Sequence, residues 1–346
     1  MNGECKLIDL RSDTVTRPTP EMREVMARAE VGDDVFGEDP SINQLQTHVA
    51  GLLGREAGLF VPSGSMANQV SIKAHTQPGD EIICERGAHV YNYESGGPSF
   101  LSGVQVLPLD GIHGMITAEQ IESAIRPKNV HHPITRLICL ENTHNRAGGT
   151  VFPIDEIRSI RKMADQYKLH MHLDGARLWN ASIATDIPLH EYAQYFDSVV
   201  VCFSKGLGAP VGSMITGSSD FIRTAHRYRK MFGGAMRQAG VLAAAALHAV
   251  QNHYVRMKED HENAQILAGA IDAIPGLEVD LESVQTNIVF FDVDPSFGTA
   301  GKVAERLKEK GVLVIATSAS RIRVVTHLDV SREQVEEAAQ IFRTVL

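Results

Sequence analysis

Two residues that follow apolar runs have the side chains that one cofactor chemistry requires. Residues 168–173 lead to Asp174, and residues 198–203 lead to Ser204 and Lys205. Both runs are typical of buried strands, and open α/β sheets bind ligands at the carboxyl ends of their strands. An acid can keep a pyridine nitrogen protonated, and an amine can form a Schiff base with an aldehyde. Pyridoxal phosphate carries both groups, so the pair points to this cofactor.

Each of the two residues also has a simpler explanation. A lysine at a strand end can merely be solvated, and an acid before Gly175 can be a turn or helix-cap residue. Gly206 and Gly208 follow Lys205, and glycines let a bulky cofactor lie close to the backbone. A lysine that forms a Schiff base must react as the neutral amine, which burial and nearby cations favour. The two residues together favour cofactor binding more than either does alone.

Small residues and histidines supply further candidates. Ser63-Gly64-Ser65 precedes an expected helix over 66–75, whose free N–H groups could bind a phosphate, although simple helix capping explains the same sequence. His89 could stack on a cofactor ring or carry a proton, or it could be an ordinary surface residue. Weaker candidates for the same role are His131, His132 and His144. None of the 15 histidines has a zinc-binding spacing, so no metal site is expected.

Three arginines are candidates for binding an anion. Arg177 follows Asp174 closely, Arg237 follows a pair of glycines, and Arg323 lies in an expected strand near the C-terminus. A guanidinium group binds a carboxylate through two parallel hydrogen bonds. We therefore expect one or two of these arginines to bind an amino-acid carboxylate.

Composition limits the class of protein. The chain has 346 residues, a net charge of −9 and 43% hydrophobic residues, which favours a globular protein and disfavours nucleic acid or an anionic membrane as partner. Its four cysteines form no C-x-x-C pair, and Cys84, Cys139 and Cys202 lie in apolar runs, as expected for reduced thiols. The first residues resemble no signal peptide, and the apolar stretch 239–250 is too short for a bilayer. These features predict a cytoplasmic protein.

The chain divides into three expected parts. Residues 1–38 are turn-rich and suit an N-terminal arm packing near the active site, residues 39–250 a large domain, and residues 251–346 a small C-terminal α+β domain. Between residues 58 and 217 short apolar runs alternate with helical stretches, which predicts an α/β fold with a mostly parallel sheet. Only residues 206–210 separate Lys205 from the next run, too few for a crossover. The strand over 211–216 should therefore return antiparallel.

Several stretches together resemble the low-specificity L-threonine aldolase family of fold-type I enzymes, which use pyridoxal phosphate. The resemblance runs in order through nearly the whole chain. The matching stretches are Asp9–Thr16, Val31–Pro40, Pro62–Asn68, Glu141–Asn145, His172–Arg177, Ser204–Ser213, Gly233–Gln238 and Arg323–Asp329.

The resemblance implies a role for each candidate. Lys205 would carry the Schiff base, Asp174 would bond the pyridine nitrogen, and His89 would stack on the ring. The groups holding the cofactor would further include Gly64, Ser65, Arg177, Ser204 and Arg237. Ser12, Arg177 and Arg323 would hold the substrate carboxylate, and His131 would lie near the substrate hydroxyl. The general base stays open between His89, His131 and a bound water.

The family also implies the reaction and the assembly. The expected activity is cleavage of L-threonine or L-allo-threonine to glycine and acetaldehyde by a homodimer or homotetramer with shared active sites. A β-eliminating lyase, a transaminase or a racemase on the same fold remains an alternative, as does a non-catalytic cofactor-binding protein. Phe36 stands where relatives commonly have tyrosine, and Ser65 where threonine is common, so a phenolic role at position 36 is in doubt.

Overall fold

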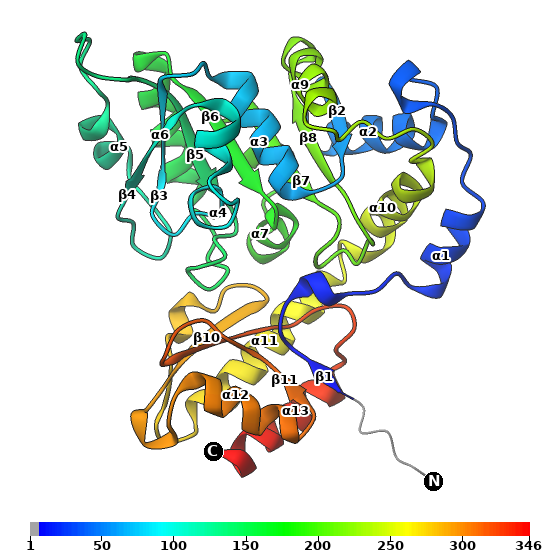
Figure 1. The fold of residues 1–346 in the computed structure, drawn as a ribbon. Coiled ribbons are helices and arrows are strands. Elements are labelled where there is room, and N and C mark those ends of the chain that lie inside the picture. Colours follow the sequence, from blue (N-terminus) through cyan, green and yellow to red (C-terminus); the bar gives the residue numbers. More distant parts are fainter. Residues whose placement is uncertain (1–6) are drawn as a thin grey trace.

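The computed structural model describes residues 7–346. The first residues, on which the signal-peptide prediction depends, lie outside the described residues, as does Cys5. Figure 1 shows a larger part, built mainly from the first two thirds of the chain, above a smaller C-terminal part, with α10 and α11 running from one to the other. None of the helices within residues 7–346 has the length and apolar character needed to cross a membrane.

A seven-stranded sheet forms the centre of the larger part. Its order is β2-β8-β7-β6-β5-β3-β4, and β8 alone runs antiparallel to its neighbours. The antiparallel return after Lys205 is therefore confirmed. The strands are β2 (Ala57–Val61), β3 (Asp80–Glu85), β4 (Gln105–Leu109), β5 (Ile134–Glu141), β6 (His170–Gly175), β7 (Ser198–Cys202) and β8 (Ser213–Gly217).

Helices cover both faces of this sheet. Val200 packs toward α3 (Gly64–His75) and α9 (Ser219–Met231), whereas Val199 and Val201 point into the main core on the opposite face. This alternation follows from the period of two along a strand. The helices that contribute to the main core are α1 (Pro20–Ala27), α2 (Pro40–Leu52), α5 (Ala118–Ala124), α6 (Ile154–Tyr167), α7 (Leu178–Thr185), α8 (Leu189–Ala193) and α10 (Gly240–His253).

The smaller part has a separate hydrophobic core. An antiparallel sheet of order β12-β13-β10-β9 packs with three helices, and Ile8 and Leu10 from the N-terminal segment join this core. β1 (Ile8–Asp9) pairs in parallel with β11 (Val312–Leu313). The other elements are α11 (Met257–Asp272), α12 (Ala300–Glu309), α13 (Arg332–Val345), β9 (Leu277–Val279), β10 (Ile288–Val293), β12 (Ile315–Ala316) and β13 (Arg321–Val325).

Local sequence signals explain several element ends. Asp39 caps α2 by accepting the Ile42 N–H, and Ser331 forms a capping box with Gln334 at the start of α13. Three successive helices, α9, α10 and α11, lead from the larger part to the smaller one, and Gly233, between the first two, has a positive φ of 78°. Asp174 lies inside β6, one residue before its end, so the expected position just after the strand is wrong by that margin.

Candidate active site

Asp174 lies at the carboxyl end of β6, in the middle of the sheet edge where ligands bind in open α/β folds. It is 3% exposed. Its Oδ2 accepts a hydrogen bond from Asn68 Nδ2 at 2.8 Å, and its Oδ1 accepts one from the Ala176 N–H at 3.1 Å. Burial alone would raise the pKa of Asp174, but His89, Lys205 and Asn68 outweigh it and hold that pKa below its usual value. The acid is therefore ionised at neutral pH.

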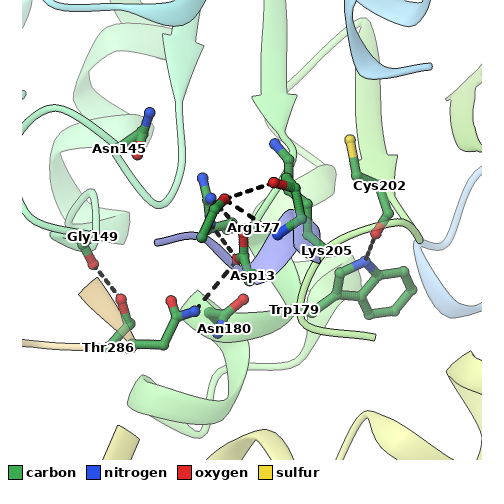
Figure 2. Close-up of polar contacts among 12 residues, drawn as sticks. Asp13, Asn145, Gly149, Arg177, Trp179, Asn180, Cys202, Lys205 and Thr286 are labelled. Atoms are coloured by element: carbon green, nitrogen blue, oxygen red, sulfur yellow. Dashed lines mark hydrogen bonds and ion pairs between the residues drawn. The ribbon is translucent and has the colours of Figure 1, made fainter. Parts of the chain in front are cut away.

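Lys205 lies in the turn after β7, next to the β6 end that carries Asp174. Its backbone carbonyl accepts hydrogen bonds from Thr16 Oγ1 at 3.1 Å and from the Gly208 N–H at 2.8 Å, so both the arm and the glycine turn fix its backbone. Its half-buried ammonium has no hydrogen bond or ion pair with any described residue. The amine is thus available to a ligand. Trp179 supports this region by donating to the Cys202 carbonyl at 3.0 Å (Figure 2).

Asp13, which sequence reasoning missed, lies beside Lys205 and Arg177 (Figure 2). Arg177 Nε and Nη2 donate to its two carboxylate oxygens at 2.7 Å each, and both side chains are buried. Burial would raise the pKa of Asp13, but the charge of Arg177 and its hydrogen bonds lower it strongly. Asn287, from the smaller part, adds a contact of 3.4 Å to the same carboxylate. Asp13 therefore orients Arg177, whose Nη1 has no hydrogen bond within the described residues.

Arg323 extends from β13 of the smaller part toward the same sheet edge. It lines a cavity of about 360 Å³ together with His89, Tyr93 and Asn145. Its Nη1 donates to Asn145 Oδ1 at 3.0 Å and its Nη2 to the Arg11 carbonyl at 3.1 Å, whereas its Nε is buried and has no partner among the described residues. Burial and the charge of Arg177 lower the pKa of Arg323. A cationic group with an unused donor is suited to an anionic ligand.

His89 begins α4 (His89–Asn92) and is held by two acids. Its backbone N–H donates to Glu141 Oε2 at 2.7 Å, and its Nδ1 lies 2.8 Å from Oε1 of the buried Glu94. Burial would lower the pKa of His89, but the hydrogen bond to Glu94 and the charges of Asp174, Glu94 and Glu141 raise it. Ligand atoms of His89, Glu94 and Asp174 lie within 4.8 Å of one another, as in a metal site. However, Asn68 already donates to both carboxylates, which disfavours a cation there.

The expected phosphate-binding residues surround the N-terminus of α3. Ser63 Oγ accepts the Met66 N–H at 3.2 Å, so the capping explanation holds for Ser63, while Ser65 is exposed. A Cβ at Gly64 would lie 2.8 Å from Cys202 Sγ, which shows how closely this helix end approaches the end of β7, where Ser204 is half-buried. The loop before Arg237 packs on Met66 through Gly234. Arg237 itself is exposed and pairs with Asp33 at 2.8 Å.

The structure does not bring His131 to this site. It is exposed in the loop that precedes β5, and its backbone N–H donates to Asn129 Oδ1. Glu141 ends the same strand at the site edge, and a strand rises about 3.3 Å per residue, so the eight-residue β5 separates its first residue, Ile134, from Glu141 by about 23 Å. His131 precedes Ile134 and therefore lies near the opposite edge of the sheet. His132 is exposed in the same loop. His144 is buried, and its Nε2 lies 3.0 Å from Glu85 Oε2. Ser12 is half-buried next to Asp13, and its Oγ accepts from Thr14.

Residues 9–294 match the β-eliminating lyase family, which is more than half of the chain. The chain belongs to this family. Among its β-eliminating lyase relatives, low-specificity L-threonine aldolase 1 of Arabidopsis thaliana is 44% identical over 344 residues, covering 98% of this chain and 96% of the relative. The low specificity L-threonine aldolase of Escherichia coli K12 is 42% identical over 341 residues, covering 98% of this chain and 99% of that relative.

A solved threonine aldolase structure from Leishmania major superposes with a TM-score of 0.84 at 20% identity, covering 98% of this chain and 99% of that one. At this identity the likeness concerns the fold. It confirms the fold-type I arrangement that the sequence predicts, with a mostly parallel central sheet and one antiparallel strand.

Sequence reasoning missed four buried polar residues of the site: Asp13, Asn68, Glu94 and Glu141. Asp13, Asn68 and Glu141 lie inside stretches that carry the family resemblance, so a signal was present for them. Glu94 follows α4 in a loop that has no distinctive pattern. Its burial depends on α3, which is more than twenty residues earlier in the chain, and only the fold reveals it.

Proposed function

We propose that this protein is a pyridoxal phosphate-dependent aldolase that cleaves L-threonine and L-allo-threonine to glycine and acetaldehyde. One observation carries the proposal: an ionised, buried Asp174 and a Lys205 whose amine has no partner among residues 7–346 lie at the ends of adjacent strands in a chain of this family. The relatives at 42% and 44% identity are low-specificity L-threonine aldolases, which supports threonine as the substrate.

The residues present fit the cofactor. Lys205 offers an amine that no residue in the described part of the chain engages, and Asp174 offers a carboxylate that stays charged, as a protonated pyridine nitrogen requires. The N-terminus of α3 adds free N–H groups for a phosphate at Gly64 and Ser65. When bound, the cofactor supplies an electron sink for the pair left on Cα by bond cleavage. We assign the phosphate further to Ser204 and Arg237, and ring stacking to His89.

We assign the substrate carboxylate to Arg323, which lines the cavity, and to Arg177. Among residues 7–346, the buried Nε of Arg323 has no hydrogen-bond partner, and Arg177 Nη1 has none beyond the pair that Nε and Nη2 form with Asp13. Ser12 stands next to Asp13 and completes this group. Two guanidinium groups that disfavour each other's charge are stabilised by an anion between them, which orients the amino acid relative to Lys205.

His89 is the candidate that moves the proton of the substrate hydroxyl within one chain. Glu94 holds a proton at Nδ1, so the opposite ring nitrogen, Nε2, is left for the substrate. His131 can serve only a neighbouring copy, since it lies at the far edge of its own sheet. We therefore propose a homodimer or homotetramer in the cytoplasm in which copies share sites. The exposure of Phe36 and Arg237 supports such an interface.

We also propose the division into an arm (1–38), a large domain (39–250) and a small domain (251–346). Two separate hydrophobic cores support it, one formed mainly by residues up to Met257 and the other mainly by residues from Ala264 onward. Ile8 and Leu10 of the arm belong to the second core, and Met22 to the first. The arm would therefore connect both domains beside Lys205.

In the decisive assay, purified protein is first loaded with pyridoxal phosphate and then incubated with L-threonine or L-allo-threonine. The acetaldehyde released is measured through the oxidation of NADH by alcohol dehydrogenase. Glycine and acetaldehyde in equal amounts support the proposal. Keto acid with ammonia would instead indicate β-elimination, and inverted substrate a racemase.

To test shared sites, Lys205→Ala protein is mixed with His131→Phe protein after brief unfolding. Activity above that of either variant supports sharing, and its absence in a verified mixed oligomer contradicts it.

A further inference from the structure

A line of polar side chains, buried except for the half-buried His75, runs from α3 across the sheet to the candidate active site. His75 Nε2 lies 2.8 Å from Ser198 Oγ, which in turn lies 2.8 Å from His172 Nδ1. His172 Nε2 lies 3.1 Å from Asn68 Oδ1, and the Asn68 amide reaches two acids. None of these contacts follows from the cofactor roles assigned above. Their geometry fixes where each proton lies.

The two carboxylates determine the orientation of Asn68. Its Nδ2 lies 2.8 Å from Asp174 Oδ2 and 2.8 Å from Glu94 Oε1. An ionised carboxylate only accepts hydrogen bonds, so the NH₂ end of the amide must face the two acids. The opposite orientation would place a carbonyl oxygen against two negative oxygens. Asn68 Oδ1 must therefore face His172 and accept.

The orientation of Asn68 in turn fixes the protons of the histidines. His172 Nε2 must carry a hydrogen, because Asn68 Oδ1 cannot donate. Burial lowers the pKa of His172 to about 4, so the ring is neutral and Nδ1 accepts from the Ser198 hydroxyl. That hydroxyl has one hydrogen, so it accepts from His75 Nε2–H. All donors along the line point toward Asp174 and Glu94.

We propose that Asn68 is a positioning residue that couples Asp174 to Glu94, and that His172 acts through it by fixing its amide. Glu94 accepts three donors, Asn68, Gln69 and His89, and has no Arg or Lys partner among the described residues. Asp174 likewise keeps its charge without a direct ion pair in that part of the chain. One amide thus supports both Asp174, which would bond the cofactor nitrogen, and Glu94, which holds His89.

The consequence for the cofactor rests on the proposed function. An N–H bond to Asp174 stabilises its charged form, so the proton shared with a pyridine nitrogen stays on the nitrogen. Without that bond Asp174 is a stronger base and takes more of the proton. The cofactor ring would then be a weaker electron sink, although Asp174 itself is unchanged. His89, Lys205 and His172 also lower the pKa of Asp174, and the charge of Asp174 in turn raises the pKa of His144, Cys139 and Cys202.

The first experiment uses the wild-type protein without cofactor. Nitrogen-15 NMR of the labelled histidines, assigned by comparison with His172→Gln, reports which ring nitrogen carries the hydrogen. We expect His172 as the Nε2–H form, with a bare Nδ1. A Nδ1–H form would reverse the line of donors and overturn the proposal, whether or not the protein binds pyridoxal phosphate.

The second experiment uses the holoenzyme with nitrogen-15 in the pyridine ring. Asn68→Ala should move the ring nitrogen signal toward the unprotonated value and weaken cofactor affinity about tenfold, equal to about 1.4 kcal/mol. Gln69→Ala is the matched control, since Gln69 donates to Glu94 at 2.5 Å but does not contact Asp174. It should keep the protonated signal. An unchanged signal and affinity in Asn68→Ala would overturn the proposal.

A second pair of variants covers the case in which Asn68→Ala does not fold. His172→Gln retains an amide N–H that can reach Asn68 Oδ1, whereas His172→Leu has no donor. We expect the ring nitrogen to stay protonated in the former and to lose its proton in part in the latter. Equal signals in both would contradict the role of His172. If wild-type protein binds no pyridoxal phosphate, the proposed function fails, and the tautomer of His172 still decides this inference.

Discussion

The Asp13→Asn variant should have a lower Tm than the wild-type protein, because the substitution removes one charge of a buried ion pair. Asp13 is fully buried, Arg177 nearly so, and two hydrogen bonds of 2.7 Å join them. Breaking one partner of such a pair costs about 3–5 kcal/mol, since the other charge stays buried without compensation. With about 2.1 cal/mol/K of unfolding entropy per residue over 346 residues, this corresponds to about 4–7 °C in Tm.

Differential scanning calorimetry of the cofactor-free protein measures this effect, and an exposed pair provides the control. Asp220 and Arg223 are joined at 2.6 Å but lie largely in solvent, so Asp220→Asn should leave Tm unchanged. The pKa of Asp13 is lowered in the folded state, so its contribution is present above the unfolded value near 3.9 and is lost as pH falls toward the folded pKa. The difference between wild type and variant should therefore narrow in acid. Equal Tm values for the two variants at pH 7 would refute the reasoning.

Three other variants address single parts of the site. Lys205→Ala should abolish the covalent adduct that borohydride traps between protein and pyridoxal phosphate, and mass spectrometry that finds the adduct unchanged would remove Lys205 from this role. Arg323→Lys should raise the KM for threonine at least tenfold, because lysine cannot reproduce the planar donor group; steady-state kinetics with an unchanged KM would contradict the carboxylate assignment. The buried, neutral His172 should destabilise the protein as pH falls from about 6.5 to about 4, by about 3 kcal/mol in total, because only the unfolded chain takes up the proton. Urea unfolding of wild type and His172→Gln across this range checks it, and parallel curves would refute it.

The sequence predicts the sheet and its site edge well, because the relevant signals are local. Six apolar runs, separated by amphipathic stretches, specify six strands, and the short 206–210 connection specifies the antiparallel direction of β8. Asp174 and Lys205 are found in the same way, as polar residues at the ends of apolar runs. Such residues need no knowledge of tertiary contacts.

The partners of these residues could not be predicted in the same way. Asp13 meets Arg177 across 164 positions of sequence, and Asn68 meets Asp174 across 106. In the sequence, Asp13 resembles an exposed acid in a surface turn. Only the structure shows that its segment contacts Lys205. Likewise, His131 is a weaker candidate than His89 in sequence, but nothing local excludes it from the site. Only the direction of β5 shows that the two lie at opposite edges of the sheet.

The arrangement of the site implies that it depends on both hydrophobic cores, but unequally. Asp174, Lys205 and His89 are all held by the larger part, whereas Arg323 and Asn287 come from the smaller one. Asn287 reaches Asp13, and Asp13 orients Arg177, so the smaller part influences both arginines assigned to the substrate carboxylate. Loosening the smaller core should therefore impair substrate binding before it releases the cofactor. We therefore expect cofactor binding and substrate binding to be separable by mutations in the smaller core.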